Sequence, residues 1–153
     1  MSILRLSDTD RAYLAGFLDA DGSIYVRAKP NPTYRFGYQI APAIVFFQSA
    51  KARESFEKMC KLMPFGSLRE RKDGVCEYII QRLSDLEEMI RLVEPFVRLK
   101  KRQLILLKKI LDAKKREQNQ ITFTKLLELV DQFRELNYSK KRIRRILPVE
   151  TER

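Results

Sequence analysis

Two aspartates close a short run of apolar and small residues, and their positions suit metal chemistry. The run extends from Leu14 to Gly22 and contains Asp19 and Asp21. Gly22 is expected to end a helix in a left-handed conformation, which places Asp21 at the negative end of the helix dipole. A cation would offset that unfavourable position, and hard divalent cations prefer oxygen ligands. We therefore expect Asp21 to hold a metal ion and Asp19 to serve a structural role, as a cap or a local partner.

The helix that would carry Asp21 has a clear start and a stripe of small residues. Ser7 supplies an N-cap oxygen, and acidic residues follow it in the first turn. Ala12, Gly16 and Ala20 recur every four residues, so they fall on one face of the helix. If two copies of the chain pack along this face, their Asp21 carboxylates come close together and need a shared counter-ion.

The composition narrows the possible functions. A chain of 153 residues fits one domain, and its net charge of +11 points to a polyanionic partner. Histidine is absent, and Cys60 and Cys76 lack metal-ligand spacing, which excludes zinc fingers and Ser-His or Cys-His catalysis. No apolar run reaches membrane-spanning length and no secretory pattern opens the chain. We expect an intracellular protein with reduced thiols that acts with its target genome and not at a membrane.

The first predicted hairpin has one basic and aromatic face. Residues 23–29 alternate between apolar and polar side chains, as a half-buried strand does. A turn is expected at residues 30–33 and a long second strand over residues 34–47. Pro42 lies inside that strand and cannot donate to a ladder, so an edge, a bend or a bulge is expected there.

A second hairpin is predicted further along the chain. Its strands are expected over residues 67–71 and 75–82, around a turn at residues 72–74 that ends in glycine. Polar and basic side chains again share one strand face. Because the DNA major groove admits a two-stranded β-ribbon, two such hairpins predict a sheet that binds DNA.

Amphipathic helices are expected between and after the hairpins. One begins at Ser49, and another follows a capping box formed by Ser84 and Glu87 and ends at Pro95. Two more follow toward the C-terminus. The apolar positions that define these helices are Phe56, Met59, Cys60, Met63, Leu86, Met89, Ile90, Val93, Leu104, Leu107, Ile110, Leu111, Leu126, Leu129, Val130 and Phe133. The order of elements predicts an α+β fold.

Residues 14–22 closely resemble the LAGLIDADG motif of the homing endonucleases, differing from it only at Phe17 and Leu18, both apolar replacements. The resemblance extends through most of the chain, and the motif occurs once. It implies the αββαββα fold of that family with an appended helical tail. The chain would be a single domain, with a core at about residues 7–118 and a helical C-terminal region at about residues 119–153.

Family members with one motif act as homodimers, so the resemblance implies a dimer interface along the motif helix. The residues expected at this interface are Ala12, Ala15, Gly16 and Asp19. The resemblance also implies that Asp21 and the backbone carbonyl of Ala20 hold the metal. Mg²⁺ is the expected ion, and Mn²⁺ or Ca²⁺ can occupy such a site.

Further catalytic residues follow only from the resemblance. Gln48 matches the residue that orders water or metal near the scissile phosphate, and Lys100 matches the active-site lysine. Without the resemblance, Gln48 would be interpreted as an amide at a strand end and Lys100 as a surface charge. Lys101 is the neighbouring candidate for the active-site lysine. The family commonly has another basic residue where this chain has Ala52. Either neighbour of Ala52, Arg53 or Lys51, can substitute.

Two sets of residues are expected to contact DNA. The base-contacting set comprises Tyr25, Arg27, Lys29, Asn31, Tyr34, Gln39, Ser67, Arg69, Arg71 and Glu77. A basic C-terminal segment, which alone reads equally as a solvated helix, is expected to contact phosphates through Ser139, Lys140, Lys141 and Arg142.

The resemblance implies a homodimeric, Mg²⁺-dependent DNA endonuclease of the kind that serves intron homing. It would cut both strands of a long pseudo-palindromic site and leave short 3′ overhangs. Two alternatives remain open: an RNA-binding maturase or DNA-binding regulator that keeps the fold without cleavage, and a basic scaffold that binds nucleic acid nonspecifically. Double-stranded DNA and a second copy of the chain are the expected partners, and RNA only for a maturase.

Overall fold

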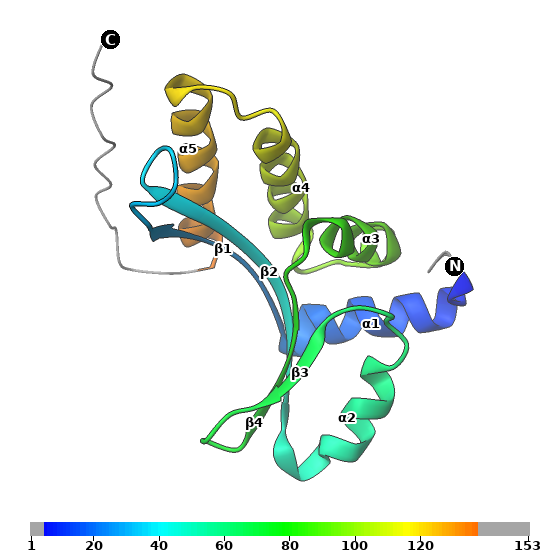
Figure 1. Cartoon of the computed structure of the whole chain (residues 1–153). Helices are drawn as coiled ribbons and strands as arrows, with labels where there is room; N and C mark the ends of the chain where they lie inside the picture. Colours follow the sequence, from blue (N-terminus) through cyan, green and yellow to red (C-terminus); the bar gives the residue numbers. More distant parts are fainter. Residues whose placement is uncertain (1–4, 138–153) are drawn as a thin grey trace.

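The computed structural model describes residues 5–137. Its elements are α1 (Asp8–Asp21), β1 (Gly22–Pro30), β2 (Tyr38–Ser49), η2 (Ala50–Ala52), α2 (Arg53–Cys60), β3 (Ser67–Glu70), β4 (Val75–Ile80), α3 (Leu83–Val93), α4 (Lys101–Lys115) and α5 (Gln120–Leu136). The strands form one antiparallel sheet in the order β1-β2-β4-β3. Figure 1 shows the helices arranged along one side of this bent sheet. The predicted α+β class and αββαββα order are confirmed.

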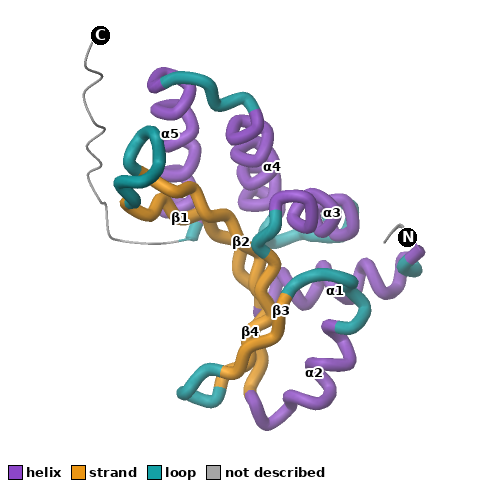
Figure 2. Tube along the Cα trace, in the orientation of Figure 1, coloured by secondary structure: helices purple, strands orange, loops and turns teal. Residues whose placement is uncertain are grey.

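The core lies between the sheet and the helices because the strands alternate in polarity. Ile24 and Val26 of β1 and Ile44 and Phe46 of β2 are buried against the helices. Phe17 of α1 packs on Phe46 with ring centroids 5.7 Å apart. Figure 2 shows the other side of the sheet, which no helix of the described chain covers. This open side can meet a partner.

The start of α1 follows the prediction and its end does not. The Asp10 amide donates to Ser7 Oγ at 3.1 Å, as an N-cap requires. Gly22 was expected in a left-handed conformation, but it has φ −101° and ψ 171° and is the first residue of β1. A Cβ on Gly22 would lie 2.8 Å from the Cα of Leu18. The glycine is therefore needed for close approach, and the helix passes directly into the strand.

The first hairpin has a longer loop than expected, and β2 begins at Tyr38, not at residue 34. The Asn31 amide donates to the Gly37 carbonyl at 2.8 Å, which closes the loop between the strands. Gly37 has φ +80°, a conformation that glycine adopts easily. Phe36 is buried in this loop and stacks on Phe123 of α5, with centroids 4.9 Å apart. Residues 34–37, which were expected in the second strand, thus belong to a loop in which Phe36 packs on α5.

Pro42 lies inside β2, opposite Val26 of β1. Strand β4 pairs with β2 only over residues 44–49, so β2 has one neighbouring strand at Pro42. The proline is therefore at a local edge, as predicted. The second hairpin turns where expected, at Gly74 with φ +80°. Its strands are shorter than expected and end at Glu70 and Ile80.

The predicted capping box of α3 is wrong. The helix begins after Arg82, which makes no side-chain cap, and Ser84 already lies in the first turn. Glu87 instead forms an ion pair with Lys115 of α4, a partner that no local pattern indicates. The apolar faces expected for α2 to α5 are buried or packed against the core. Helix α5 belongs to the same core and contacts β1 and α4.

Candidate functional site

Asp21 lies at the exposed end of α1, at the rim of an open hollow of about 470 Å³. Ala20 of the same helix and Gln48 near the end of β2 line this hollow with Asp21. The Gln48 side-chain oxygen accepts the Ser49 amide at 2.8 Å, which leaves the NH₂ group of Gln48 as a donor. The structure thus brings together the three residues expected around the metal.

Lys100 also reaches the end of α1. Its ammonium donates to the carbonyl oxygen of Asp19 at 2.7 Å. The Asp19 carboxylate in turn accepts the backbone amides of Arg98 at 2.8 Å and of Lys100 at 3.0 Å. Asp19 therefore ties the segment before α4 to α1 and holds Lys100 at the last turn of this helix, although Lys100 is not among the residues that line the Asp21 hollow. The ammonium of Lys100 therefore supplies some of the positive charge expected at the end of α1. Lys101, the first residue of α4, is exposed.

Arg53 and Lys51, the two candidates for the second basic residue, lie in different surroundings. Arg53 begins α2 and pairs with Glu70 of β3 at 3.0 Å. The hydrogen bond that Arg53 donates to the Glu70 carboxylate raises the pKa of Arg53, so its guanidinium is charged and already has a partner. Arg53 is not among the residues that line the Asp21 hollow, and Lys51 is exposed and makes no ion pair within residues 5–137. Of the two alternatives, Lys51 is the one free to move toward a phosphate.

The donor set of the Asp21 hollow suits a hard cation. It offers the Asp21 carboxylate and backbone carbonyls, which are oxygen ligands of the kind Mg²⁺ binds, whereas the Gln48 amide oxygen already accepts the Ser49 amide. No group of three or more His, Cys, Asp or Glu side chains converges anywhere in the described residues. Among the residues that line this hollow, Asp21 is the one that carries a carboxylate.

The small stripe of α1 is exposed, as a packing surface requires. Ala12, Gly16 and Ala20 all face outward, and a Cβ added to Gly16 would meet no atom within 4 Å. Ala15 was expected at the same surface, but it is 0% exposed and belongs to the core of its own chain. One helical step turns Ala15 about 100° away from Gly16, which is enough to move it off the stripe and into the core. Asp19, the fourth expected interface residue, is engaged within its own chain.

The strand register places the expected base-contacting residues on the open face of the sheet. Lys29 pairs with Gln39, and Arg69 pairs with Glu77. Alternation along each strand then gives one continuous row of side chains. The strand residues on this face are Ser23, Tyr25, Arg27, Lys29, Gln39, Ala41, Ala43, Val45, Phe47, Ser67, Arg69, Val75, Glu77 and Ile79.

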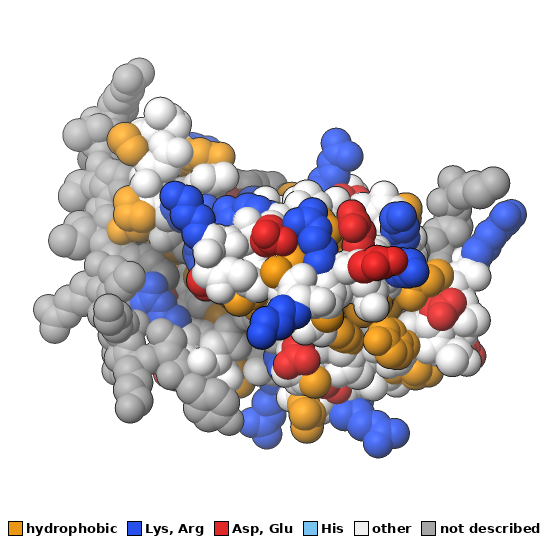
Figure 3. All heavy atoms as spheres, turned by 90° about the horizontal axis from the view of Figure 1, so that it is seen from below, with side chains coloured by type: hydrophobic (Ala, Val, Ile, Leu, Met, Phe, Trp, Pro, Cys, Tyr) orange, Lys and Arg blue, Asp and Glu red, His pale blue; other side chains and the backbone are white. Residues whose placement is uncertain are grey.

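Charges on this face are paired before any ligand arrives. Glu77 lies 3.2 Å from Arg69 and 3.3 Å from Arg71, and its side chain is only 12% exposed. Arg71 also contacts Asp73 of the turn at 2.6 Å. Figure 3 shows the molecule from below, where lysine and arginine side chains lie beside acidic ones. The acids hold the arginines in place, so the open face is basic but ordered.

The loop residues expected at the interface differ in their freedom. The Asn31 side-chain oxygen accepts the Thr33 amide at 3.1 Å and the Thr33 hydroxyl at 2.7 Å. Asn31 therefore shapes the loop, with its NH₂ group left to donate. Tyr34 is exposed at the tip. Ser139, Lys140, Lys141 and Arg142 lie outside the described residues.

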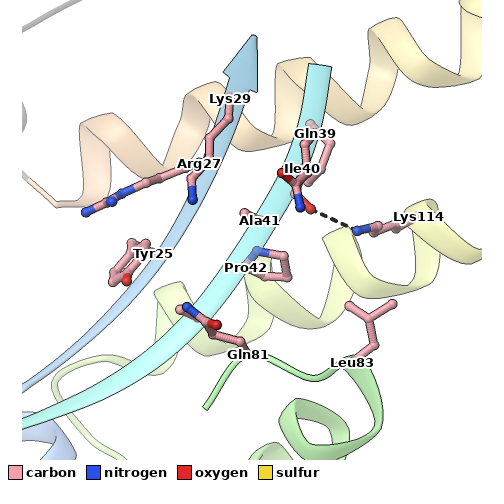
Figure 4. A pocket seen from close by; sticks show the side chains of 11 residues that line it. Tyr25, Arg27, Lys29, Gln39, Ile40, Ala41, Pro42, Gln81, Leu83 and Lys114 are labelled. Carbon is pink, nitrogen blue, oxygen red and sulfur yellow. Dashed lines mark hydrogen bonds between the residues drawn. The ribbon is translucent and has the colours of Figure 1, made fainter. Parts of the chain in front are cut away.

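A second hollow, of about 230 Å³, contains residues that the sequence did not single out (Figure 4). Tyr25, Arg27 and Gln39 line it from the open face of the sheet. Gln81 after β4 and Lys114 of α4 also line it. Gln81 has the same strand parity as Glu77, a signal that could have identified it. Lys114 donates to the Ile40 carbonyl at 2.8 Å, a long-range contact with no sequence signal.

Nothing in the described part of the chain forms a helix that is both long and apolar enough to span a membrane.

The chain is similar in sequence to DNA endonucleases. Residues 14–111 match the LAGLIDADG endonuclease family. The DNA endonuclease I-CreI of Chlamydomonas reinhardtii is 33% identical over 131 residues, which cover 85% of this chain and 80% of that protein. The DNA endonuclease I-CvuI of Chlorella vulgaris is 30% identical over 100 residues, covering 65% of this chain and 62% of that protein.

The fold is likewise similar to that of solved homing endonucleases. The structure of I-CvuI bound to a DNA target in the presence of Mg has a TM-score of 0.81 at 26% identity, covering 92% of this chain and 88% of that one. A second structure of I-CvuI, with its own target and Ca, gives the same values. The family match covers more than half of the chain, from within the motif helix into α4, and both sheet hairpins lie within it. On this evidence the chain belongs to the LAGLIDADG endonuclease family.

Proposed function

We propose that this protein is a site-specific DNA endonuclease that acts as a homodimer on a long pseudo-palindromic target and leaves short 3′ overhangs. Residues 1–153 would act as one domain, in which the endonuclease core spans about residues 7–118 and the helical C-terminal region, about residues 119–153, joins it through α5. The observation that carries the proposal is the single exposed carboxylate of Asp21 beside the exposed small stripe of α1. One chain offers half of a two-carboxylate site, and packing of two stripes completes it.

The residues around Asp21 have distinct tasks in this proposal. Asp21 and the carbonyl of Ala20 would hold Mg²⁺, in a site that Mn²⁺ or Ca²⁺ can also occupy. A divalent cation bound there would activate water and stabilise negative charge on the phosphate. The Gln48 NH₂ group can donate to that water or to a phosphate oxygen. Lys100, held by the Asp19 carbonyl, adds a positive charge near the leaving oxygen.

Recognition would come from the open face of the sheet. Arg27, Lys29, Arg69 and Arg71 can contact guanine or phosphate, and Gln39 can contact adenine. Glu77 is positioned to orient two of these arginines. Double-stranded DNA is the partner that suits a curved basic sheet, because the major groove accepts paired strands.

A library of randomised DNA duplexes tests the proposal. Purified protein is incubated with Mg²⁺ or with EDTA, and the cut ends are sequenced. We expect metal-dependent cuts at one partly palindromic motif, and a loss of at least 100-fold in cleavage for Asp21→Asn, because the metal loses its charged ligand. Asp112→Asn, an exposed position on α4, is the matched control and should cut normally.

Three results would contradict the proposal in different ways. If the Asp21→Asn protein cut as fast as the original, Asp21 would not be a metal ligand in the active site. If the protein cut DNA in EDTA, cleavage would not depend on a divalent cation. Selective binding without any cutting would favour a regulator or an RNA-binding maturase that keeps the fold.

A further inference from the structure

Gln81 lies outside every strand, directly after β4. Ile80 pairs with Ile44, so the next position in this register sets Gln81 beside Ala43. On the other side of β2, Ala43 pairs with Tyr25. Gln81, Ala43 and Tyr25 therefore form one row across the open face of the sheet.

The exposure of Ala43 shows how its neighbours lie. No helix covers this face, yet Ala43 is only 1% exposed. Both Tyr25 and Gln81 line the hollow above it. Figure 4 shows the amide end of Gln81 turned toward Tyr25, across β2. The two side chains thus flank the small residue and form part of the surface that a ligand on the sheet would touch.

The Gln81 carboxamide is available to a ligand. Gln81 is exposed, and its side chain makes no hydrogen bond with any residue between 5 and 137. The hollow is also lined by Arg27 and Lys29, which attract a polyanion. In the major groove, a glutamine amide can pair with the N6 and N7 atoms of adenine.

We propose that Gln81 is a base-reading residue that sets target preference at one position of each half-site, with adenine as the favoured base. This inference rests on the proposed function and extends the reading surface beyond the four strands. Tyr25 lies four residues from Asp21, about 13 Å along a strand, which corresponds to roughly four base-pair steps. Gln81 reads DNA at that distance from the scissile phosphate.

The test is selection of randomised duplexes by binding in Ca²⁺, with the bound DNA sequenced and cleavage measured separately. Gln81→Ala should lose roughly 5- to 150-fold of the base preference at one symmetric pair of positions and keep the others. Gln81→Glu should shift that preference toward cytosine, whose amine a carboxylate accepts. Gln132→Ala, exposed on α5, is the matched control and should leave the whole profile unchanged.

An unchanged base profile in both Gln81 variants would overturn the inference. So would an equal loss of preference at all positions, because that pattern reports general weakening of binding. Unchanged thermal unfolding midpoints verify that the variants fold. The selection measures binding and not cleavage. If the protein binds selectively but does not cut, endonuclease function is refuted, and the base profiles of the Gln81 variants still test the inference. Binding without any sequence selection overturns both.

Discussion

At the scale of single residues, Asp19 and Asp21 show how two neighbouring carboxylates acquire different tasks. Asp19 accepts two backbone amides and its carbonyl accepts Lys100, so it joins α1 to the segment before α4. Asp21, two residues later, is exposed and lines the hollow with Gln48. Successive helical residues point in different directions, and two steps separate a core-facing side chain from a ligand-facing one. The separation keeps the structural bond apart from the proposed chemistry.

A buried thiol gives a second residue-scale effect. Burial raises the pKa of Cys60 from 9.0 to about 12. Between those values the unfolded chain releases a proton that the folded chain keeps, so the free energy of unfolding falls as pH rises; below pH 9 this effect is absent. The raised pKa of Tyr78 acts in the same direction, and the lowered pKa of Lys114 acts in the opposite one.

We therefore predict that Cys60→Ala weakens the alkaline loss of stability. Urea unfolding between pH 8.5 and 11 should show a shallower slope, by at most about 1.4 kcal/mol per pH unit. Met59→Ala is the matched control, because it also empties a buried position but removes no titrating group. It should lower stability at every pH and keep the slope. A Cys60→Ala slope equal to that of the original protein would refute the assigned pKa.

At the scale of elements, α1 serves two surfaces at once. Leu14, Ala15 and Leu18 are fully buried against the sheet, and the small stripe of Ala12 and Gly16 faces out. The helix also anchors α3, because the Arg11 guanidinium donates to the carbonyls of Leu92 and Arg91, each at 3.0 Å. A helix held by both the sheet and α3 offers a rigid face, which favours close packing of a second copy.

Gly16→Leu tests that packing. In a single chain the added side chain points into open space, so folding should not suffer and helix propensity should improve by about 0.5–1 kcal/mol. Between two helices it would prevent close approach. We expect a shift from dimer to monomer in sedimentation equilibrium, while the monomer still unfolds in one cooperative thermal transition.

The control for that variant is Gln132→Leu, which adds the same side chain to an exposed position of α5. It should leave the dimer intact. A Gly16→Leu protein that remains dimeric would show that the copies associate through another surface.

At the scale of the whole molecule, charge and shape act together. The net charge of +11 attracts DNA over a distance, while the curved sheet with its ion-paired arginines offers a fixed surface. On the helix side of the sheet, acidic residues pair with lysines of α4: Glu87 of α3 with Lys115, and Glu94, which follows α3, with Lys108 at 3.6 Å. On the open face, Arg27 and Lys29 make no ion pair with any residue between 5 and 137, so their charges are available to a polyanion.

We predict that affinity for the target falls steeply with salt while sequence preference persists. A dimer that makes six to ten phosphate contacts should lose about 10³- to 10⁵-fold in affinity between 50 and 200 mM salt. Binding to target and scrambled duplexes, measured across this range, gives both the slope and the preference. Equal affinity for the two duplexes at every salt concentration would support a nonspecific basic scaffold instead.

Substitution of two lysines tests how much the open face of the sheet contributes to the salt dependence of DNA binding. Lys29→Gln on the open face should make the logarithmic salt slope shallower by about one for each copy that contacts a phosphate. Lys108→Gln, on the helix side, should leave the slope unchanged. A larger effect of Lys108→Gln than of Lys29→Gln would indicate that DNA binds the helix side and not the open face of the sheet.

Local patterns in the sequence determined much of this protein. The cap at Ser7, the small stripe of α1 and the turn at Gly74 each depend on neighbouring residues, and each is as predicted. Hydrophobic periodicity identified the buried faces of α2 to α5 for the same reason. The motif at residues 14–22 identified the family, and strand alternation indicated which side chains share a face.

Only the tertiary structure decided which distant groups meet. Lys100 reaches Asp19 across 81 positions of sequence, and Lys114 reaches Ile40 across 74. The extended conformation of Gly22, the burial of Ala15 and the pairing of Arg53 with Glu70 likewise depend on neighbours that come from other elements. Periodicity and capping report interactions within a few residues, whereas close approach, burial and ion pairing are set by how the elements pack.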